Sequence, residues 1–253
     1  NLRILKQFNG CCFADLDLKQ QGVIEDFQLL FYIIQPPTPE RVKYDIFDRV
    51  NRGGTPLNKQ EMRNALYRGR CTRMLDKLCC SPEFLIATGR SINKERMKDQ
   101  YVVLRAMAFL MLHRGEFKDI PALQYRGDID DFLARFMVYV NDNAPEKLIV
   151  DYENLFIRCM QISYDLLGEN GFRFSGNGIR RPINMPLFEA LSYLFSFVPE
   201  KIDYTWVSRL ILDIESVKEE FDDSRYFSGN IDSTTSVSFR FDRMDKIINR
   251  IQL

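Results

Sequence analysis

The residue types that would do chemistry gather in one stretch of the chain, between two segments of helical pattern. Asn51, Arg52, Gly53 and Gly54 form the expected turn there. Such a turn leaves backbone N–H groups free beside a helix N-terminus, which favours the binding of an anion. Glycine and asparagine also supply the backbone angles that a purely structural turn needs, so both interpretations stay open. The turn is a candidate phosphate site.

The charge around this turn supports a polar functional face. The whole chain is balanced, with 35 basic and 35 acidic residues. Two acidic residues lie between positions 49 and 77, together with eight basic ones: Arg49, Arg52, Lys59, Arg63, Arg68, Arg70, Arg73 and Lys77. The compensating acid lies mainly between residues 200 and 223. This asymmetry is typical of a surface for phosphate or nucleic acid, although a solvated helix face would carry it as well.

A single arginine interrupts the longest apolar run of the sequence. Arg105 is the one charged residue between positions 101 and 112, in a segment that is apolar on nearly every side and is therefore expected to be buried. A buried guanidinium is costly unless it is paired or reaches an anion. We therefore expect a structural salt bridge with Asp99 or with an acid elsewhere. The alternative is that Arg105 reaches the same polar pocket as Asn51 and Arg63.

The residue inventory excludes several enzyme chemistries. The chain has one histidine, His113, whereas a nuclease of the His-Asn-His type needs more than one to hold metal and activate water. His113 ends an apolar helix, where capping of carbonyls or partial exposure is expected rather than catalysis. No Walker-type phosphate loop occurs. The six cysteines lack Cys-x-x-Cys spacing and fit free thiols better than a zinc site, so we predict no catalytic residue and no metal site in this chain.

Helical signals dominate the chain and predict a mainly α fold. Apolar residues recur at helical spacing over 42–50, 101–112, 148–167, 186–197, 203–221 and 244–251. Asn58 and Glu61 have the spacing of a capping box, and Gly69 and Gly168 are placed to end helices. The best strand candidate is 27–34, which is apolar and precedes two prolines. We predict a multi-helix orthogonal bundle with one or a few short strands near the N-terminus, as a single domain over 1–253 with a flexible loop at 222–238.

The segment Ile46–Gly69 also resembles a known signature. It is similar to the second conserved block of the domain at the front of GmrSD-type, modification-dependent restriction endonucleases. Other segments resemble further parts of that family in the same order, namely Leu5–Leu16, Asp99–Arg105, Phe172–Phe174, Arg181–Phe188 and Ser238–Arg243. The resemblance therefore covers nearly the whole chain.

The resemblance implies a part of a larger nucleotide-hydrolysing protein. Family members carry an Asp-Gly-Gln-Gln-Arg motif on a ParB-like α/β portion, and that motif is tied to nucleotide hydrolysis; no such run occurs here. We therefore expect this chain to be the C-terminal helical part of a longer α/β plus α domain, inactive by itself. A nucleoside triphosphate and Mg²⁺ would belong to the intact protein, and the chain itself is expected to hold no cofactor.

Two hypotheses about function follow. In the first, the chain completes a nucleotide pocket and contacts DNA in a bacterial, cytoplasmic restriction or phage-defence system. The expected nucleotide or phosphate contacts are Asn51, Arg52, Gly53, Gly54, Arg63, Asn64 and Arg105, and the expected DNA contacts are Arg68, Arg70 and Arg73. In the second, it is a helical interaction module that joins a nucleotidase sensor to a nuclease domain or subunit and exposes an apolar patch on a late helix. No apolar run is long enough to span a bilayer.

Overall fold

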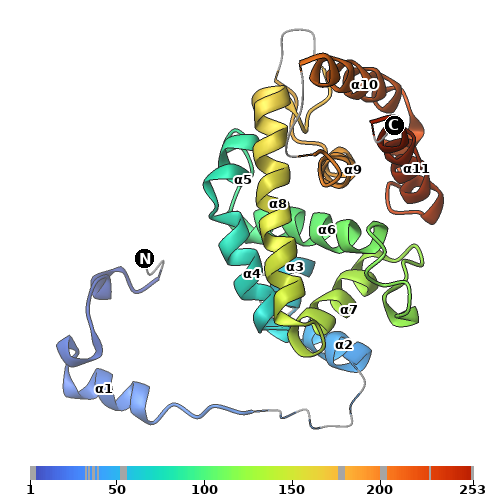
Figure 1. The fold of residues 1–253 in the computed structure, drawn as a ribbon. Coiled ribbons are helices and arrows are strands. Elements are labelled where there is room, and N and C mark those ends of the chain that lie inside the picture. The colour runs from blue at the N-terminus through green and yellow to red at the C-terminus, as the bar shows by residue number, and fades with distance from the viewer. Residues whose placement is uncertain are drawn as a thin grey trace. The chain divides into compact units, whose positions relative to one another are not determined.

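The computed structural model describes residues 4–31, 33, 35, 38, 40–51, 56–175, 180–199, 204–227 and 229–251. Within them lie eleven α-helices and no β-strand, so the fold is mainly α, as predicted (Figure 1). The chain divides into two units, Asn1–Ile46 and Phe47–Leu253, whereas the sequence predicts one domain over 1–253. The boundary falls within α2 (Glu40–Asn51), the helix expected over 42–50.

The first unit contains short helical elements. They are η1 (Lys6–Phe8), η2 (Phe13–Asp15), α1 (Leu18–Glu25) and the beginning of α2. Asp17 caps α1, because its side chain accepts a hydrogen bond from the backbone N–H of Gln20. None of the described residues of these first three helical elements is buried, so core packing does not determine where they begin and end.

The predicted strand at 27–34 is wrong for the residues that the structure describes. Residues 27–31 and Ile33 have no regular secondary structure, and positions 32 and 34 lie outside the described residues. A strand needs a neighbouring strand for its backbone hydrogen bonds, and the described part of the chain offers only helices. The β propensity of this segment therefore has no partner with which to be realised.

The second unit is built from the helices that follow α2. Their bounds are α3 (Lys59–Leu66), α4 (Arg70–Cys79), α5 (Pro82–Ala87), α6 (Lys98–His113), α7 (Ile129–Asp142), α8 (Glu146–Leu167), α9 (Met185–Phe195), α10 (Tyr204–Asp222) and α11 (Thr234–Ile251). Short 3-10 turns join some of them, namely η3 (Glu95–Met97), η4 (Pro121–Leu123), η5 (Gly168–Asn170) and η6 (Arg225–Phe227).

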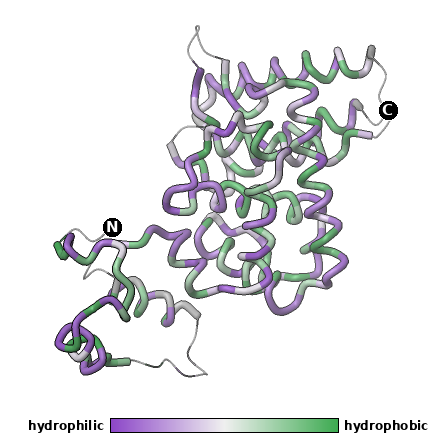
Figure 2. The backbone as a smooth tube through the Cα atoms, turned by 90° about the vertical axis from the view of Figure 1, so that its left-hand side faces the viewer, coloured by the Kyte–Doolittle hydropathy of each residue, from purple (hydrophilic) through white to green (hydrophobic). Residues whose placement is uncertain are grey.

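The centre of this unit is the pair α6 and α9. Residues 102–111 of α6 and 186–195 of α9 are all buried, and the two helices pack against each other. The long helix α8 runs beside them and contacts α4, α5, α6 and α9 (Figure 1). Figure 2 shows hydrophilic and hydrophobic residues alternating along the helices of this unit, as expected where one face of a helix lies in a core.

Local sequence signals place several helix ends. The capping box at α3 is confirmed, because the Asn58 side chain accepts from the backbone N–H of Glu61 at 2.9 Å and the Glu61 carboxylate accepts from that of Asn58 at 2.6 Å. Gly168 ends α8 as predicted, with φ of 60°. Gly69, however, does not end α3, which stops at Leu66; it precedes α4 instead. The predicted loop 222–238 contains η6 and the first residues of α11.

Candidate functional site

The two central helices each carry one charge within their buried part, and the structure places these charges against each other. Arg105 lies in the middle of α6 and Glu189 in the second turn of α9. The Arg105 Nε donates to Glu189 Oε1, and the two side chains are 1% and 0% exposed. The predicted salt bridge of Arg105 is therefore present, but its partner is not Asp99.

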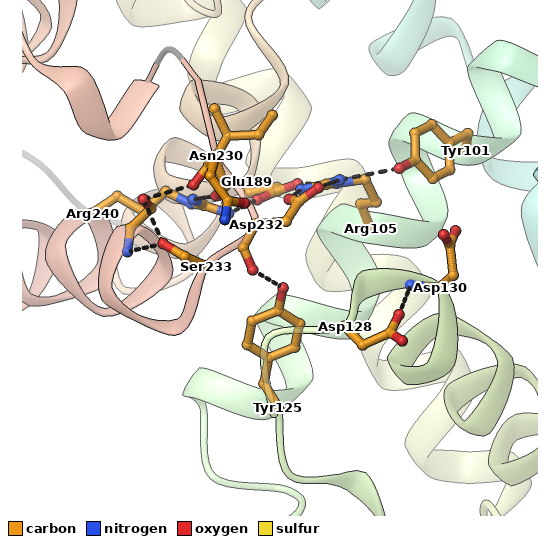
Figure 3. A network of polar contacts seen from close by, with 12 residues as sticks. Tyr101, Arg105, Tyr125, Asp128, Asp130, Glu189, Asn230, Asp232, Ser233 and Arg240 are labelled. Carbon is orange, nitrogen blue, oxygen red and sulfur yellow. Dashed lines mark hydrogen bonds and ion pairs between the residues drawn. The ribbon is translucent and has the colours of Figure 1, made fainter.

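Two further residues complete this group. Arg240 of α11 donates from Nη2 to Glu189 Oε2 at 2.7 Å, and from Nη1 to the carbonyl of Ile231 at 2.6 Å. Asp232 accepts from the Nη2 of Arg105 at 2.6 Å. We refer to Arg105, Glu189, Asp232 and Arg240 as the arginine–carboxylate cluster (Figure 3). It joins α6, α9 and α11 at the centre of the unit.

The segment that carries Asp232 is held in place by its own hydrogen bonds. Tyr125 donates from its hydroxyl to the Asp232 carbonyl, and burial together with the Asp232 carboxylate raises the pKa of this tyrosine. Ser236 donates from its hydroxyl to the carbonyl of Asn230 at 2.9 Å, and its backbone N–H donates to Ser233 Oγ at 3.1 Å. The carboxylate that faces Arg105 is therefore fixed by the turn that begins α11 (Figure 3).

The charges of the cluster balance one another. Burial alone would lower the pKa of Arg105, but Glu189 and the hydrogen bond to Asp232 raise it well above its ordinary value. Two guanidiniums and two carboxylates leave no net charge for an outside ligand. A buried network of this kind is costly to break, because the loss of one member leaves another charge uncompensated. The geometry of the cluster is therefore that of an ion-pair network that stabilises the fold rather than of a ligand site.

Arg63 and Arg105 meet at one aromatic ring. Their Cζ atoms lie 5.3 and 5.6 Å from the centroid of Tyr101. Arg63 donates from Nη1 to Asp130 Oδ1 at 2.8 Å and from Nε and Nη2 to Gln60 Oε1 at 3.1 and 2.9 Å. Burial would raise the pKa of Asp130, but Lys59 and Arg63 bring it below its ordinary value. The structure thus gathers two predicted site residues, each with partners from its own chain.

The described members of the predicted nucleotide pocket do not fit a phosphate. Arg63 and Arg105 are each 1% exposed, and chain carboxylates already balance their charge. Asn64 accepts from Gln60 Nε2 at 2.8 Å and donates to Gln100 Oε1. A phosphate would have to displace these partners. The side chain of Asn51 and all of Arg52, Gly53 and Gly54 lie outside the described residues.

The three arginines predicted to contact DNA lie on or beside the turn between α3 and α4, and they differ from one another. Arg68 and Arg73 are exposed, and the described residues offer neither an ion pair. Arg70 instead donates from Nη1 to the carbonyl of Ala144 at 3.0 Å, and its Nη2 lies 2.9 Å from Glu146 Oε2 without an aligned hydrogen bond. Arg70 therefore ties α4 to the beginning of α8.

This turn is positioned by one asparagine. Asn141 of α7 donates from Nδ2 to the carbonyl of Tyr67 at 2.9 Å and accepts at Oδ1 from the backbone N–H of Cys71, also at 2.9 Å. Its amide lies so close to Gly69 that a Cβ there would stand 2.6 Å from Asn141 Oδ1. Glycine is needed at position 69 for this close approach, and the contact holds Arg68 at the surface.

The net positive charge between residues 49 and 77 is partly balanced in the fold by acidic residues from other parts of the chain. Acidic residues from outside this stretch pair with half of its basic residues: Asp130 with Lys59 and Arg63, Glu146 with Arg70, and Glu153 with Lys77. Those acids lie on α7 and α8, far along the chain. Net charge over a sequence window therefore overstates the charge that the surface presents.

His113 is half-buried, which agrees with the predicted partial exposure. Its ring stacks on Phe241 with the centroids 3.6 Å apart, and its Nε2 has no hydrogen-bond partner. Burial, with a further contribution from Arg240, lowers its pKa to about 3. An uncharged imidazole without a polar partner is suited to packing. Within the described residues, no group of three or more His, Cys, Asp or Glu side chains could hold a metal ion.

Sequence reasoning missed Glu189, Asp232 and Arg240. A signal for Glu189 exists: it is the only charge in the apolar segment 185–195, as Arg105 is in its own segment. Two lone charges of opposite sign on two buried helices are candidates for each other, since each needs a partner. Asp232 and Arg240 carry no comparable signal, because charged residues are frequent around them.

Comparison of the chain with protein-family models, curated proteins and solved structures found no match in any of the three. The resemblance to the GmrSD-type domain therefore rests on its motifs. Among the described residues, no helix is both long enough and apolar enough to cross a membrane.

Proposed function

We propose that this chain is a non-catalytic helical part of a bacterial restriction or phage-defence protein and that it contacts DNA phosphates through the turn between α3 and α4. The observation that carries the proposal is the exposure of Arg68 and Arg73 without an ion pair among the described residues. Unpaired exposed arginines bind phosphate without first losing a protein partner. The GmrSD-type resemblance supports the defence context.

Nucleotide contact is the second part of this proposal. It now rests on residues 51–54, because Arg63 and Arg105 are balanced by Asp130, Glu189 and Asp232. Hydrolysis is not assigned to this chain, which lacks the Asp-Gly-Gln-Gln-Arg motif. In the proposal, that chemistry and its Mg²⁺ belong to another part of the intact protein.

The alternative is a helical interaction module that joins a sensor to a nuclease. It predicts a contiguous apolar patch on a late helix. Among the described residues of α9, α10 and α11, Leu212 is the only large apolar side chain that is exposed, at 71%. A single exposed leucine is ordinary for a protein surface. The described surface of these three helices therefore gives the interaction module no support.

A salt series tests the DNA proposal. Binding of the chain to a labelled duplex should weaken as salt rises, because phosphate contacts release counterions. Replacing Arg68 and Arg73 with alanine together should make the log–log slope shallower by about 2, since each contact contributes roughly 0.9. The matched control is Arg209→Ala with Lys246→Ala, two exposed basic residues on α10 and α11.

The control variant should keep the wild-type slope. Equal weakening in both double variants would mean that only overall charge matters and would remove the assignment to this turn. No binding at low salt would overturn the DNA proposal and would favour the interaction module.

A further inference from the structure

A cavity of about 380 Å³ lies where α4, α5 and the first turn of α6 meet. Its apolar wall consists of Cys79, Phe84, Leu85 and Ile92. A volume of this size lies at the small end of the range for small-molecule sites, which are mostly apolar with a few polar groups. The cavity is separate from the arginine–carboxylate cluster and from the turn that carries Arg68.

Three charged side chains also line this cavity: Arg90, Lys94 and Asp99. None of them forms an ion pair with a described residue. Arg90 and Lys94 are exposed and lie in the segment between α5 and η3. Asp99 is 7% exposed and lies in the first turn of α6. Charges of both signs thus line one cavity without forming an ion pair with each other.

Asp99 is unusual among the buried acids of the described chain. The other two, Glu153 and Glu189, pair with Lys77 and with Arg105 and Arg240. The Asp99 carboxylate has one hydrogen bond, at 2.9 Å from the backbone N–H of the next residue. The other carboxylate oxygen accepts no hydrogen bond from a described residue, so at the cavity it can accept one from an outside cation.

The pKa of the Cys79 thiol, which lies in the apolar wall, is influenced by charges of both signs. Burial raises the pKa of the Cys79 thiol, and the Asp99 carboxylate adds to this rise, whereas Lys94 opposes it. The acid and the lysine therefore both lie within electrostatic range of one atom of the apolar wall. A ligand over Cys79 would meet an anionic group and a cationic group together.

The segment 90–97 contributes Arg90, Ile92 and Lys94 to the cavity and has strained backbone conformations at its two ends, of which only Arg90 lines the cavity itself. Arg90, Arg96 and Met97 have φ of 51°, 57° and 58°, and they are the only residues other than glycine with positive φ in the described chain. Strain of this kind collects at ligand-binding segments and persists only where neighbours enforce it. Here Asn58 donates to the carbonyl of Arg96 at 2.7 Å, and Arg173 donates to that of Thr88 at 3.2 Å.

We propose that this cavity binds a small zwitterion with an apolar body, of the chemical class of a free α-amino acid with an apolar side chain. The ammonium group would meet Asp99, the carboxylate would meet Lys94 and Arg90, and the side chain would lie against the apolar wall. A plain anion is disfavoured because Asp99 would repel it, and a plain cation because of the two basic residues.

Titration calorimetry on the full chain tests this proposal, with L-leucine and L-phenylalanine as probes. Leucinamide lacks the carboxylate, and N-acetyl-leucine lacks the ammonium group. Each analogue should bind about tenfold more weakly than leucine or worse, because it leaves a charge of the cavity unmatched. Asp99→Asn should abolish binding of the amino acids, whereas Lys98→Ala, which removes a neighbouring exposed lysine outside the cavity lining, should leave it unchanged.

A second variant tests the proposal even if Asp99→Asn fails to fold. Lys94→Ala changes an exposed residue, so the melting temperature should stay at the wild-type value while affinity for leucine falls and affinity for leucinamide does not. Absence of heat with both amino acids at millimolar concentration would overturn the proposal. Equal affinity for leucine and both analogues would overturn it as well, since binding would then ignore the charges.

Discussion

Helix α6 carries two buried charged residues, of which one is paired with opposite charges and the other is not. Arg105, in its middle, has two carboxylates within hydrogen-bond distance and a second arginine that shares one of them. Asp99, in its first turn, lines a cavity and has no cation among the described residues. Both are almost fully buried. The two residues differ in pairing rather than in burial. A charge that is paired within the chain stabilises the fold, whereas an unpaired charge at a cavity is available to a ligand of opposite charge.

The same contrast recurs around α3. Arg63 is 1% exposed and paired with Asp130, whereas Arg68, five residues later, is exposed without an ion pair among the described residues. The two belong to one basic stretch of sequence and cannot be told apart by composition. Removing a paired arginine should mainly change stability, and removing an unpaired one should mainly change binding.

The largest expected effect comes from the arginine–carboxylate cluster. Arg105→Ala should destabilise the protein by about 3–5 kcal/mol, because Glu189 and Asp232 would lose a guanidinium partner and Glu189 is 0% exposed. Urea unfolding of the wild type and the variant measures this. A midpoint within error of the wild type would show that the cluster does not hold α6, α9 and α11 together.

A neutral polar contact should have an intermediate effect. Asn141→Ala removes the amide that bonds Tyr67 and Cys71, and it should cost about 1–3 kcal/mol, since a backbone donor and a backbone acceptor lose their partner. Asn143→Ala is a matched control because that exposed asparagine has no such side-chain bond. Equal losses of unfolding free energy in the two variants would remove the role assigned to Asn141.

Structural features that depend on neighbouring residues in the sequence could be predicted, whereas contacts between distant residues could not. The capping box of Asn58 and Glu61 and the end of α8 at Gly168 were predicted correctly, because each depends on residues within one turn. The partner of Arg105 was not, since Glu189 lies 84 positions away and only the packing of α6 on α9 brings it close. The segment 27–34 failed for the converse reason: its propensity is local, but a strand requires another strand.

The candidate sites also depend on contacts between residues that are far apart in the sequence. The basic stretch was visible in the sequence, but the acids that pair with half of it come from α7 and α8. The cavity was not predicted at all, because it requires α4, α5 and the start of α6 to meet around Asp99. Asp99 and Arg105 were both noted in the sequence as a possible pair, and the structure separates them.

His113 shows a third arrangement of a titratable group that packs against the core, which is to stay uncharged. Its pKa falls from 6.5 in the unfolded chain to about 3 in the fold, so between these values the unfolded chain binds a proton that the native protein does not. Stability should therefore decrease as pH drops below 6.5, by about 1–2 kcal/mol at pH 5. Urea unfolding at pH 7 and pH 5 measures the loss, and His113→Phe should reduce it. An unchanged difference in that variant would assign the pH dependence to other groups.

The smallest effect should come from an exposed pair with the same chemistry as the cluster. Arg180 and Glu169 lie 2.7 Å apart, with side chains 46% and 52% exposed, whereas Arg105 and Glu189 are 1% and 0% exposed. Water screens the exposed pair, and both side chains can be solvated when it breaks, so Arg180→Ala should change the free energy of unfolding by less than about 1 kcal/mol. Arg105→Ala, measured in the same urea series, is the matched substitution. A loss in Arg180→Ala as large as that in Arg105→Ala would mean that burial does not govern the strength of these pairs, and the contrast between paired structural charges and available surface charges would then need another cause.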